Sequence, residues 1–493
     1  MAQVKRYMAL DFGAESGRAI AAAFDGKKMD LEILRRFSTD STTMLGTLYW
    51  DFPSFIRNIK LGLSAYAGKY GSDLAGIACD SWGVDFGLLD KTGHLLANPV
   101  HYRDARTNGI PEKLHAVIPA RTLYQRTGIQ IMSFNTIYQL YAMVLNNSPL
   151  LDKAVSMLLI ADLASYFLSG TPVQEYTTAT TSEMYDAERM DWSRDSLLSA
   201  KIPPGMMPEI VAPGTVIGPL LDSVAAECGL GPTPIIAPGS HDTASAVAAV
   251  PAEGEDWLYV SSGTWSLMGA ELAAPIINDA TFNANFTNEG GVDGTIRFLK
   301  NISGMWMLQE CRRAWAKEEG QAADYETLAR LAEEAAPFVR FVNPNGERFL
   351  APGGMPERIN AALRETGQPE AKEKGEFARL CFESLALAYR HTAQTVEELT
   401  GKKYNVLHIV GGGSLNTLLN QLAADATGMV VKAGPVEATA LGNSLMQAVA
   451  LGDVASLSEA RQVVRDSVQV KTFEPKGDRS RWDEMYSRFQ QLL

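Results

Sequence analysis

The chain has 493 residues, of which 46% are hydrophobic and 20% charged, so a disordered or fibrous protein is excluded. Because one hydrophobic core rarely extends beyond about 250–300 residues, this length predicts two domains. The 44 Lys and Arg residues stand against 57 Asp and Glu residues, and the resulting net charge of −13 disfavours nucleic acids and anionic membranes as partners.

The cysteines and the apolar segments bear on the cellular compartment. No Cys-x-x-Cys pair occurs, so neither a zinc site nor a disulfide framework is predicted, and we expect the cysteines to be buried. The apolar stretch after Lys5-Arg6 is too short for a signal-peptide core, and no apolar run approaches the roughly 20 residues that span a bilayer. We therefore expect a soluble, cytoplasmic protein. The cysteines are Cys79, Cys228, Cys311 and Cys381.

The first predicted elements are a strand, a glycine-rich turn and a returning strand. Val4–Phe12 is apolar, residues 13–17 form the turn, and Ala19–Phe24 is the second apolar run. Glycine lets a backbone approach an anion and Arg18 adds positive charge, so this is a candidate phosphate-binding turn. The alternative is an ordinary hairpin turn with Asp11 at its entrance.

A helix and another strand follow. Asp51 is a candidate N-cap, Pro53 falls in the first turn, and Leu74–Cys79 resumes a strand pattern. The apolar residues at helical spacing are Phe52, Phe55, Ile56, Ile59, Leu63 and Tyr66.

Two later segments, Asp80–Asp85 and His101–Arg106, mix aromatic rings with charged groups. Rings stack on the C–H faces of a polyol, and its hydroxyls need paired donors and acceptors, so these segments suit a sugar. The alternative is a buried tryptophan beside surface ion pairs.

The strongest candidate for catalysis is the turn that follows the short strand Pro234–Ala237. It places Asp242 where the chain enters a small-residue helix, Thr243–Val250, and functional groups usually lie at such positions in open α/β sheets. A carboxylate held there can act as a general base. The alternatives are that Asp242 only caps the helix and that His241 is a structural histidine.

The middle of the chain repeats the opening hairpin. Trp257–Ser261 and Trp265–Ala270 are predicted strands around a tight turn, Ser262-Gly263-Thr264. This turn follows the first by about half the chain, which favours two related halves, and the polar break near Val250–Asp256 predicts domains at 1–250 and 251–493.

The C-terminal half contains a long predicted helix, about Glu376–Leu399, and the strand Asn405–Val410. Three glycines follow, and then a helix with Ser414 as expected N-cap and Gly428 at its end. Glycines before a helix can bind phosphate or can be a plain connection. A last helix is expected around Trp482–Leu493. Strands and helices therefore alternate, which predicts an α/β class.

No P-loop is present, because each Gly-Lys pair lacks a following Ser or Thr. No His, Cys, Asp or Glu cluster has metal-ligand spacing, so a metal is expected only as Mg²⁺ that enters with a nucleotide.

Several segments together resemble the FGGY carbohydrate kinases. The resemblance implies two actin-like, RNase H-like domains with an active-site cleft between them. Among family activities, the match implies transfer of the γ-phosphoryl group of ATP to the primary hydroxyl of L-rhamnulose, in L-rhamnose degradation, with Mg²⁺. The matching segments are Asp11–Arg18, Asp80–Phe86, Tyr102–Asp104, Ser240–Ala246, Ser261–Gly269, Thr287–Gly291, His408–Gly413 and Ala433–Ala438.

The resemblance also implies roles for individual residues, with Asp242 as the catalytic base. Glu15 departs from the family pattern, where a small hydroxyl residue is common, so its side chain is expected to point outward or to help organise Mg²⁺. The implied sugar contacts are Gly83, His241, Asp242, Thr243 and Asn301. The implied ATP contacts are Ala14, Glu15, Ser16, Gly17, Arg18, Thr264, Gln309, Gly411 and Gly412.

Two alternatives remain at this stage. One is a kinase for another ketose or polyol, such as L-fuculose or D-xylulose, on the same fold. The other is an actin- or chaperone-like ATP switch, against which the Asp242 turn and the aromatic segments argue. The expected partners are the small molecules ATP and L-rhamnulose, and a monomer and a dimer both remain open.

Overall fold

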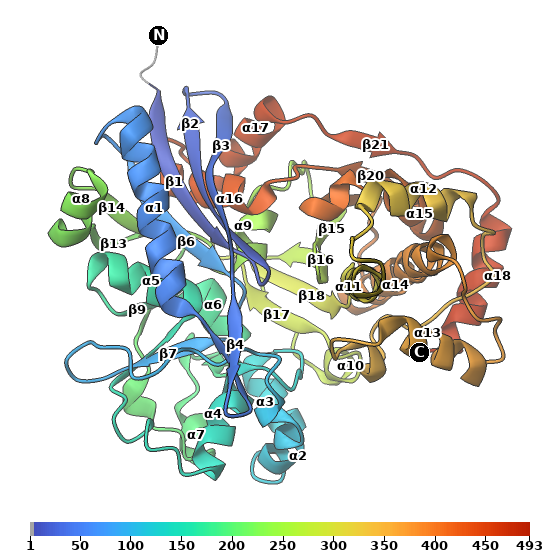
Figure 1. The fold of residues 1–493 in the computed structure, drawn as a ribbon, viewed down its shortest axis with the longest axis horizontal. Coiled ribbons are helices and arrows are strands. Elements are labelled where there is room, and N and C mark those ends of the chain that lie inside the picture. Colours follow the sequence, from blue (N-terminus) through green and yellow to red (C-terminus); the bar gives the residue numbers. More distant parts are fainter. Residues whose placement is uncertain (1–3) are drawn as a thin grey trace. The chain divides into compact units, whose positions relative to one another are not determined.

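The computed structural model describes residues 4–493 and contains two compact units (Figure 1). The first unit contains the chain up to Pro251 together with residues 271–298 and 438–467; the second contains residues 252–270, 299–437 and 468–493. Strands and helices alternate in both, so the predicted α/β class is confirmed. The sequence pattern gave no reason to expect that two segments of the C-terminal half belong to the first unit. Residues 1–3 of the predicted first domain lie outside the described residues.

The first unit is built on a six-stranded sheet with the order β13-β14-β6-β1-β2-β3. Strand β1 pairs antiparallel with β2 and parallel with β6, which in turn pairs parallel with β14. The predicted opening hairpin is therefore confirmed. The strands are β1 (Lys5–Phe12), β2 (Ser16–Phe24), β3 (Met29–Ser38), β6 (Gly76–Ser81), β13 (Thr215–Pro219) and β14 (Pro234–Ala237).

Helices cover both faces of this sheet. Alternate residues of β1 point to opposite faces, and because apolar residues occur in both sets, both faces must be buried. Met8, Leu10 and Phe12 belong to the core that also contains residues of α1 (Phe52–Tyr70) and α5 (Ile160–Ser169). Ala9 packs instead with Ala440 of α16 (Ala438–Ala450). The continuous apolar run of β1 thus reflects burial on both faces.

Helix α1 forms as the sequence predicted. Asp51 caps it by accepting a hydrogen bond from Ser54 N, Pro53 lies in the first turn, and the helix ends at Gly71. Gly62 packs so close to Ala19 that an added Cβ atom would lie 2.4 Å from the alanine methyl. This contact brings α1 directly onto β2.

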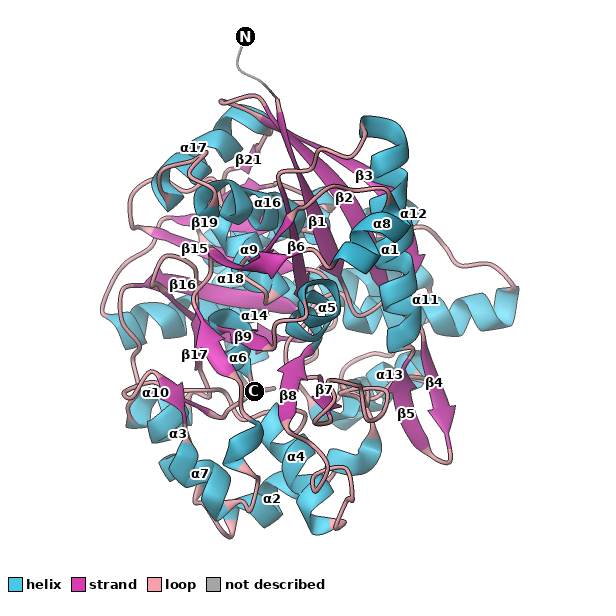
Figure 2. Cartoon of the chain, turned by 90° about the vertical axis from the view of Figure 1, so that its left-hand side faces the viewer, coloured by secondary structure: helices cyan, strands magenta, loops and turns pink. Residues whose placement is uncertain are grey.

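A second core of the first unit gathers helices around β7 and β8 (Figure 2). Its helices include α2 (Ile110–His115), α3 (Ala120–Thr127), α4 (Thr136–Leu145) and α7 (Arg194–Ser199). The short strands are β4 (Ser41–Met44), β5 (Thr47–Trp50), β7 (Phe86–Leu89), β8 (Ser156–Leu159), β9 (Val173–Glu175), β10 (Tyr185–Asp186), β11 (Asp191–Trp192), β12 (Glu209–Val211) and β17 (Thr287–Gly290). The remaining helices are α6 (Tyr176–Thr181), α8 (Asp222–Cys228), α9 (Asp242–Ala248), α10 (Asp279–Asn283) and α17 (Leu457–Ser467).

The sheet of the second unit repeats the plan of the first. Strand β15 pairs antiparallel with β16 and parallel with β19, β19 pairs parallel with β20, and β21 closes the edge antiparallel to β20. The repeated hairpin predicted from the sequence is therefore confirmed. The strands are β15 (Trp257–Ser262), β16 (Ser266–Leu272), β19 (Val406–Val410), β20 (Val430–Ala433) and β21 (Lys471–Phe473); in β18 (Ile296–Ile302) the chain passes from one unit to the other.

The three helices predicted in the second unit are present, and one of them differs from the prediction at its N-terminus. Ser414 was the expected cap of the helix after the glycines, but it lies in a short 3₁₀ turn, and Asn416 caps α15 by accepting from Leu419 N. An asparagine is as good a cap as serine, so the pattern alone did not separate them. The helices are α11 (Trp306–Glu319), α12 (Tyr325–Glu334), α13 (Met355–Glu365), α14 (Lys374–Thr400), α15 (Thr417–Thr427) and α18 (Arg479–Gln490).

All four cysteines are free and buried, as predicted. Across residues 4–493, no helix has both the length and the apolar character needed to cross a membrane.

Candidate active site

Asp242 lies at the start of α9, after the chain has left β14. The turn before it runs beside the end of β6, where Ser81 N donates to Ser240 O at 2.9 Å. His241 occupies the N-cap position and Asp242 is the first residue of the helix. Asp242 is therefore not the N-cap of α9.

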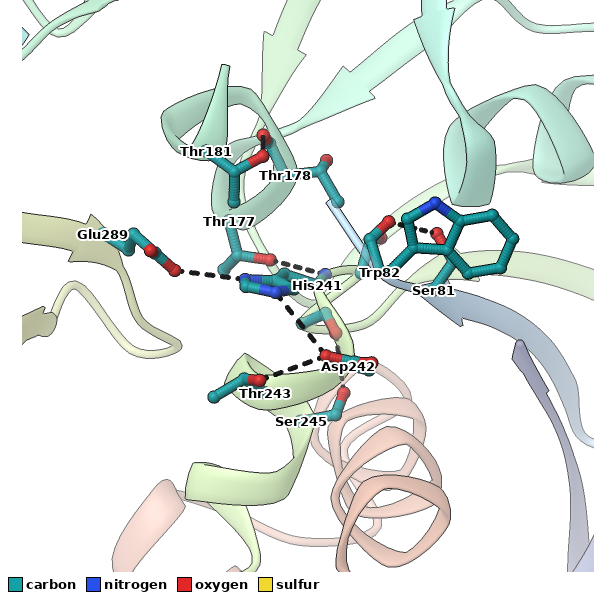
Figure 3. Close-up of polar contacts among 12 residues, drawn as sticks. Ser81, Trp82, Thr177, Thr178, Thr181, His241, Asp242, Thr243, Ser245 and Glu289 are labelled. Atoms are coloured by element: carbon teal, nitrogen blue, oxygen red, sulfur yellow. Dashed lines mark hydrogen bonds and ion pairs between the residues drawn. The ribbon is translucent and has the colours of Figure 1, made fainter. Parts of the chain in front are cut away.

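The Asp242 carboxyl group has polar neighbours on Oδ1 and remains open to a ligand. Oδ1 accepts a hydrogen bond from Thr243 Oγ1 at 3.1 Å and lies 3.5 Å from His241 Nε2, while 31% of the side chain is exposed (Figure 3). The protein around the group and the negative charge of Asp11 raise the pKa of Asp242, against the lowering influence of His241 and Thr243. A raised pKa makes a carboxylate a better proton acceptor.

His241 connects Asp242 to two buried charged residues. Its Nδ1 lies 3.2 Å from Glu289 Oε2 and 3.0 Å from Arg297 Nη2, and Arg297 is fully buried. Arg297 Nε donates to Gly290 O at 2.8 Å. Burial alone would raise the pKa of Glu289, but the positive charge of Arg297, the largest of the opposing causes, lowers it below its usual value. Glu289 therefore remains an anion inside the protein.

Glu175 and Thr177 form hydrogen bonds with the backbone of the turn that precedes Asp242. Glu175 Oε2 accepts hydrogen bonds from Ser240 N at 3.1 Å and from Thr177 Oγ1 at 2.5 Å, and Thr177 Oγ1 accepts in turn from His241 N at 3.0 Å. Glu175 is fully buried, and this burial raises its pKa to about 7. These bonds fix the turn that carries the candidate base.

Two more carboxylates lie near the same sheet edge. Asp11 of β1 is in register with Asp80 of β6, and both are buried. Arg18 of β2 faces Asp11 across the hairpin and forms an ion pair with it. Burial raises the pKa of Asp80 well above its usual value, and the charges of Asp11 and Asp242 add to the rise, while a hydrogen bond from Asn443 at 2.6 Å lowers it.

The predicted first phosphate turn is a tight connection between β1 and β2. Gly13 N donates to Ser16 O at 3.0 Å, and the Glu15 side chain is exposed, as one of the two expectations for it required. Gly17 is needed for packing, because an added Cβ atom would lie 2.3 Å from the Phe37 ring. Among the residues assigned to the first phosphate turn, Arg18 forms the ion pair with Asp11. Ala14 precedes Glu15 in the turn.

Asp85 organises the aromatic residues that the sequence suggested for a sugar. It is fully buried and accepts hydrogen bonds from Trp50 Nε1 at 2.7 Å, Trp82 Nε1 at 3.0 Å and Tyr102 N at 3.1 Å. The Trp50 and Trp82 rings lie 4.5 Å apart. Since these donors enclose it, Asp85 orients the rings rather than offering an open acceptor.

The predicted sugar contacts divide between the two units. Gly83 and residues 241–243 belong to the first unit, and Asn301 belongs to the second. At Gly83 an added Cβ atom would lie 2.6 Å from Thr181 Oγ1 of α6, so glycine is required there by packing alone.

In the second unit, the structure brings the second turn and the three glycines together. Gly411 has φ +81°, and an added Cβ atom would lie 3.0 Å from Ser262 O; at Gly413 it would lie 2.0 Å from Ser262 Oγ. At Gly412 it would meet nothing within 4 Å. The glycines thus let the backbone after β19 approach the turn after β15.

Thr264 and Gln309 both lie near the N-terminus of α11. Thr264 O accepts from Trp306 N at 3.2 Å, and Gln309 lies in the first turn of α11. Within residues 4–493, the buried Gln309 Oε1 has no hydrogen-bond partner. An amide oxygen of this kind can serve a ligand.

The sequence alone indicated no role for Glu175, Glu289 or Arg297. Glu289 lies in a segment that resembles the family, Thr287–Gly291, but only the fold brings it to His241. A usable signal for Arg297 was its place inside the apolar run Ile296–Leu299, since a charge in a buried strand requires a partner.

The described residues contain no group of three His, Cys, Asp or Glu side chains arranged to hold a metal. A nucleotide-borne Mg²⁺ needs less, because it keeps several waters and uses one or two carboxylates. Asp80 Oδ1 is buried and lacks a hydrogen-bond partner within residues 4–493, and Asp11 lies in register with it. Carboxylate oxygens are the ligands that Mg²⁺ prefers, and Asp80 Oδ1 has no other partner among the described residues, so Asp11 and Asp80 fit this ion.

Known proteins match almost the whole chain. Residues 6–249 match the N-terminal domain of the FGGY family of carbohydrate kinases, and residues 258–451 match its C-terminal domain. A rhamnulokinase of Bacteroides thetaiotaomicron is 41% identical over 489 residues, which cover 99% of each chain.

Solved structures share the fold at low sequence identity. A xylulose kinase from Lactobacillus acidophilus has a TM-score of 0.83 at 17% identity, over 99% of this chain and 97% of that one. A Plasmodium falciparum glycerol kinase with ADP has a TM-score of 0.76 at 15% identity, over 100% and 98%. With matches to both family domains, this chain belongs to the FGGY family of carbohydrate kinases.

Proposed function

We propose that this protein transfers the γ-phosphoryl group of ATP to the primary hydroxyl of L-rhamnulose. The observation that carries the proposal is the full-length identity of 41% to a rhamnulokinase. The placement of Asp242, partly exposed beside His241 and Thr243, supports it.

In this proposal Asp242 is the general base. The acceptor hydroxyl must lose its proton as its oxygen attacks phosphorus, and the Asp242 carboxylate accepts that proton. The raised pKa of Asp242 strengthens it as an acceptor. Since Thr243 and His241 hold Oδ1, the second carboxyl oxygen is the one that we assign to the substrate.

Binding of the sugar falls to the first unit. Trp82, whose indole N–H donates to Asp85, and Tyr102, whose backbone N–H does so, offer ring faces for the C–H groups of a ketose. We assign Gly83, His241, Asp242 and Thr243 to its hydroxyl groups, and Asn301 as a further contact from the second unit.

We assign the nucleotide to turn residues of both units. Backbone N–H groups of a tight turn can bind phosphate oxygens, and Arg18 supplies a positive charge. In the second unit, the open position at Gly412 and the unmet amide oxygen of Gln309 support nucleotide roles. The remaining assigned residues are Ala14, Glu15, Ser16, Gly17, Thr264 and Gly411.

We further propose Mg²⁺ as the metal that accompanies ATP. Asp11 and Asp80 are the residues that would hold it, directly or through water. Bound there, the ion would neutralise charge on the phosphate oxygens. The proposed division of the chain assigns the sugar site, the first phosphate turn and the base to 1–250, and the second turn and nucleotide contacts to 251–493.

The test is ADP release with ATP, Mg²⁺ and a ketose panel. We expect kcat/KM to be highest with L-rhamnulose, and the product to carry its phosphate on the primary hydroxyl by NMR. A higher kcat/KM with L-fuculose or D-xylulose would reassign the substrate within the family. ATP hydrolysis unaffected by every sugar would support an ATP switch and contradict the proposal.

A further inference from the structure

The Nδ1 atom of His241 has two neighbours of opposite charge. Glu289 Oε2 lies 3.2 Å away, and Arg297 Nη2 lies 3.0 Å away. The two neighbours also contact each other, with Nη2 at 3.1 Å from Oε2. Because a carboxylate accepts a hydrogen bond and a guanidinium only donates one, they make opposite demands on the same ring nitrogen.

The geometry favours the guanidinium of Arg297, rather than the carboxylate of Glu289, as the hydrogen-bond partner of His241 Nδ1. Nη2 is placed to donate to Nδ1, whereas Glu289 Oε2, buried as it is, has no donor in hydrogen-bond alignment within residues 4–493. The negative charge of Glu289 is balanced by Arg297 without a proton on Nδ1. An Nδ1 atom that accepts must be unprotonated, so the ring proton of a neutral His241 lies on Nε2.

That location of the proton matters because Nε2 is the atom that faces the base. It lies 3.5 Å from Asp242 Oδ1, as the dashed line in Figure 3 shows. An N–H group there attracts Oδ1, and Thr243 Oγ1 donates to the same oxygen. If the proton moved to Nδ1, a lone pair on Nε2 would face the carboxylate and repel it.

Arg297 is held firmly enough for this task. It is 0% exposed, its Nε donates to the Gly290 carbonyl, and a guanidinium has no acceptor atom, so it can only donate to Nδ1. A buried arginine is costly to desolvate, and replacing such an ion pair by apolar residues often leaves stability unchanged or improves it. Stability alone therefore gives a weak reason for its presence.

We propose that Arg297 is a positioning residue for phosphoryl transfer: by donating to His241 Nδ1 it keeps the imidazole proton on Nε2 and directs that N–H group to Asp242. Glu289 compensates the charge of Arg297 and does not receive the imidazole proton. The inference rests on the proposed function, in which Asp242 is the base.

The direct test is the tautomer of His241, read by ¹⁵N NMR on histidine-labelled protein without substrate. The chain has six histidines, and the signals of His241 are assigned by their loss in His241→Gln. We expect an unprotonated Nδ1 and a protonated Nε2. A proton on Nδ1 in the wild-type protein would overturn the proposal.

Two variants separate the donor from the anion. In Arg297→Gln the unpaired Glu289 is expected to draw a proton onto Nδ1, with a kcat lower by about 10- to 100-fold and an unchanged KM for ATP. In Glu289→Gln the donor remains, so the proton is expected to stay on Nε2. A folded Arg297→Gln protein that keeps the wild-type tautomer or the wild-type kcat would contradict the proposal.

The control is Arg461→Gln, which removes another largely buried guanidinium of the first unit. Arg461 pairs with Glu271 at 2.9 Å and lies near Val247, at the far end of α9 from Asp242. We expect this variant to keep the His241 tautomer and kcat; a loss like that of Arg297→Gln would overturn the specific role of Arg297.

If Arg297→Gln does not fold, the wild-type tautomer decides the matter. A wrong proposed function would show itself differently, as a wild-type protein with no sugar-dependent ADP release.

Discussion

The backbone N–H group of His241 donates a hydrogen bond to Thr177 Oγ1 at 3.0 Å, and this bond joins α6 to the turn that carries Asp242. Thr177 Oγ1 donates in turn to Glu175 Oε2. One hydroxyl group therefore satisfies a buried donor and a buried acceptor, and it sets where α9 begins.

Replacing Thr177 by valine keeps the shape of the side chain but removes both bonds. Glu175 Oε2 keeps its hydrogen bond from Ser240 N, but the buried N–H group of His241 loses its acceptor, which should cost about 1–3 kcal/mol of unfolding free energy, measured by denaturant titration. We expect kcat to fall about tenfold with an unchanged KM for ATP, because the base shifts while the nucleotide contacts do not.

Thr177→Ser is the matched control, because it keeps the hydroxyl group. It should retain most of the stability and of the kcat. Equal losses in the serine and valine variants would show that the methyl group, and not the hydrogen bonds, supports the turn.

Glu175 gives stability a defined pH dependence. Its pKa is raised by burial from 4.5 to about 7, so between these values the folded protein binds more protons than the unfolded chain. Stability from this group is therefore lost as the pH rises through that window and stays low above it. Glutamine does not titrate, so Glu175→Gln lacks this contribution. Between about pH 5 and about pH 8, the free energy of unfolding should therefore fall by about 1–3 kcal/mol less in the variant than in the wild type. Identical pH profiles from chemical denaturation would refute the prediction.

Asp242→Asn tests the base itself. The amide has nearly the same shape, so the fold and the affinity for ATP, measured by calorimetry, should be retained. It cannot accept a proton from the acceptor hydroxyl, so kcat should fall by about 100- to 10,000-fold. Near-wild-type turnover with the preferred ketose would contradict the assignment of Asp242 as the base.

Local patterns in the sequence predicted local structure well. The N-cap at Asp51, the helix from about Glu376 and both hairpins rest on residues close together in the chain, where spacing and turn residues decide the conformation. Asp242 was found in the same way, as a carboxylate between a strand and a helix.

What the sequence could not predict depends on contacts between distant residues. Arg297 and His241 are 56 positions apart in the sequence, and only the fold brings Arg297 of β18 to 3.0 Å from His241, the N-cap of α9. Likewise, the sequence did not show that α16 (Ala438–Ala450) packs on the sheet of the first unit, because small apolar residues fit many surfaces.

Gly413→Ala tests whether the backbone after β19 must touch the second turn. An added Cβ atom would lie 2.0 Å from Ser262 Oγ and 2.6 Å from Ser262 Cβ, so the backbone has to move. We expect about 1–3 kcal/mol of destabilisation and weaker ATP binding, measured by thermal unfolding and calorimetry. Gly412→Ala is the control for stability, because an added Cβ atom there meets nothing within 4 Å, and its Tm should stay close to that of the wild type. If both variants melt at the wild-type temperature, the second turn tolerates a shift of this backbone and the close contact is not required for the fold.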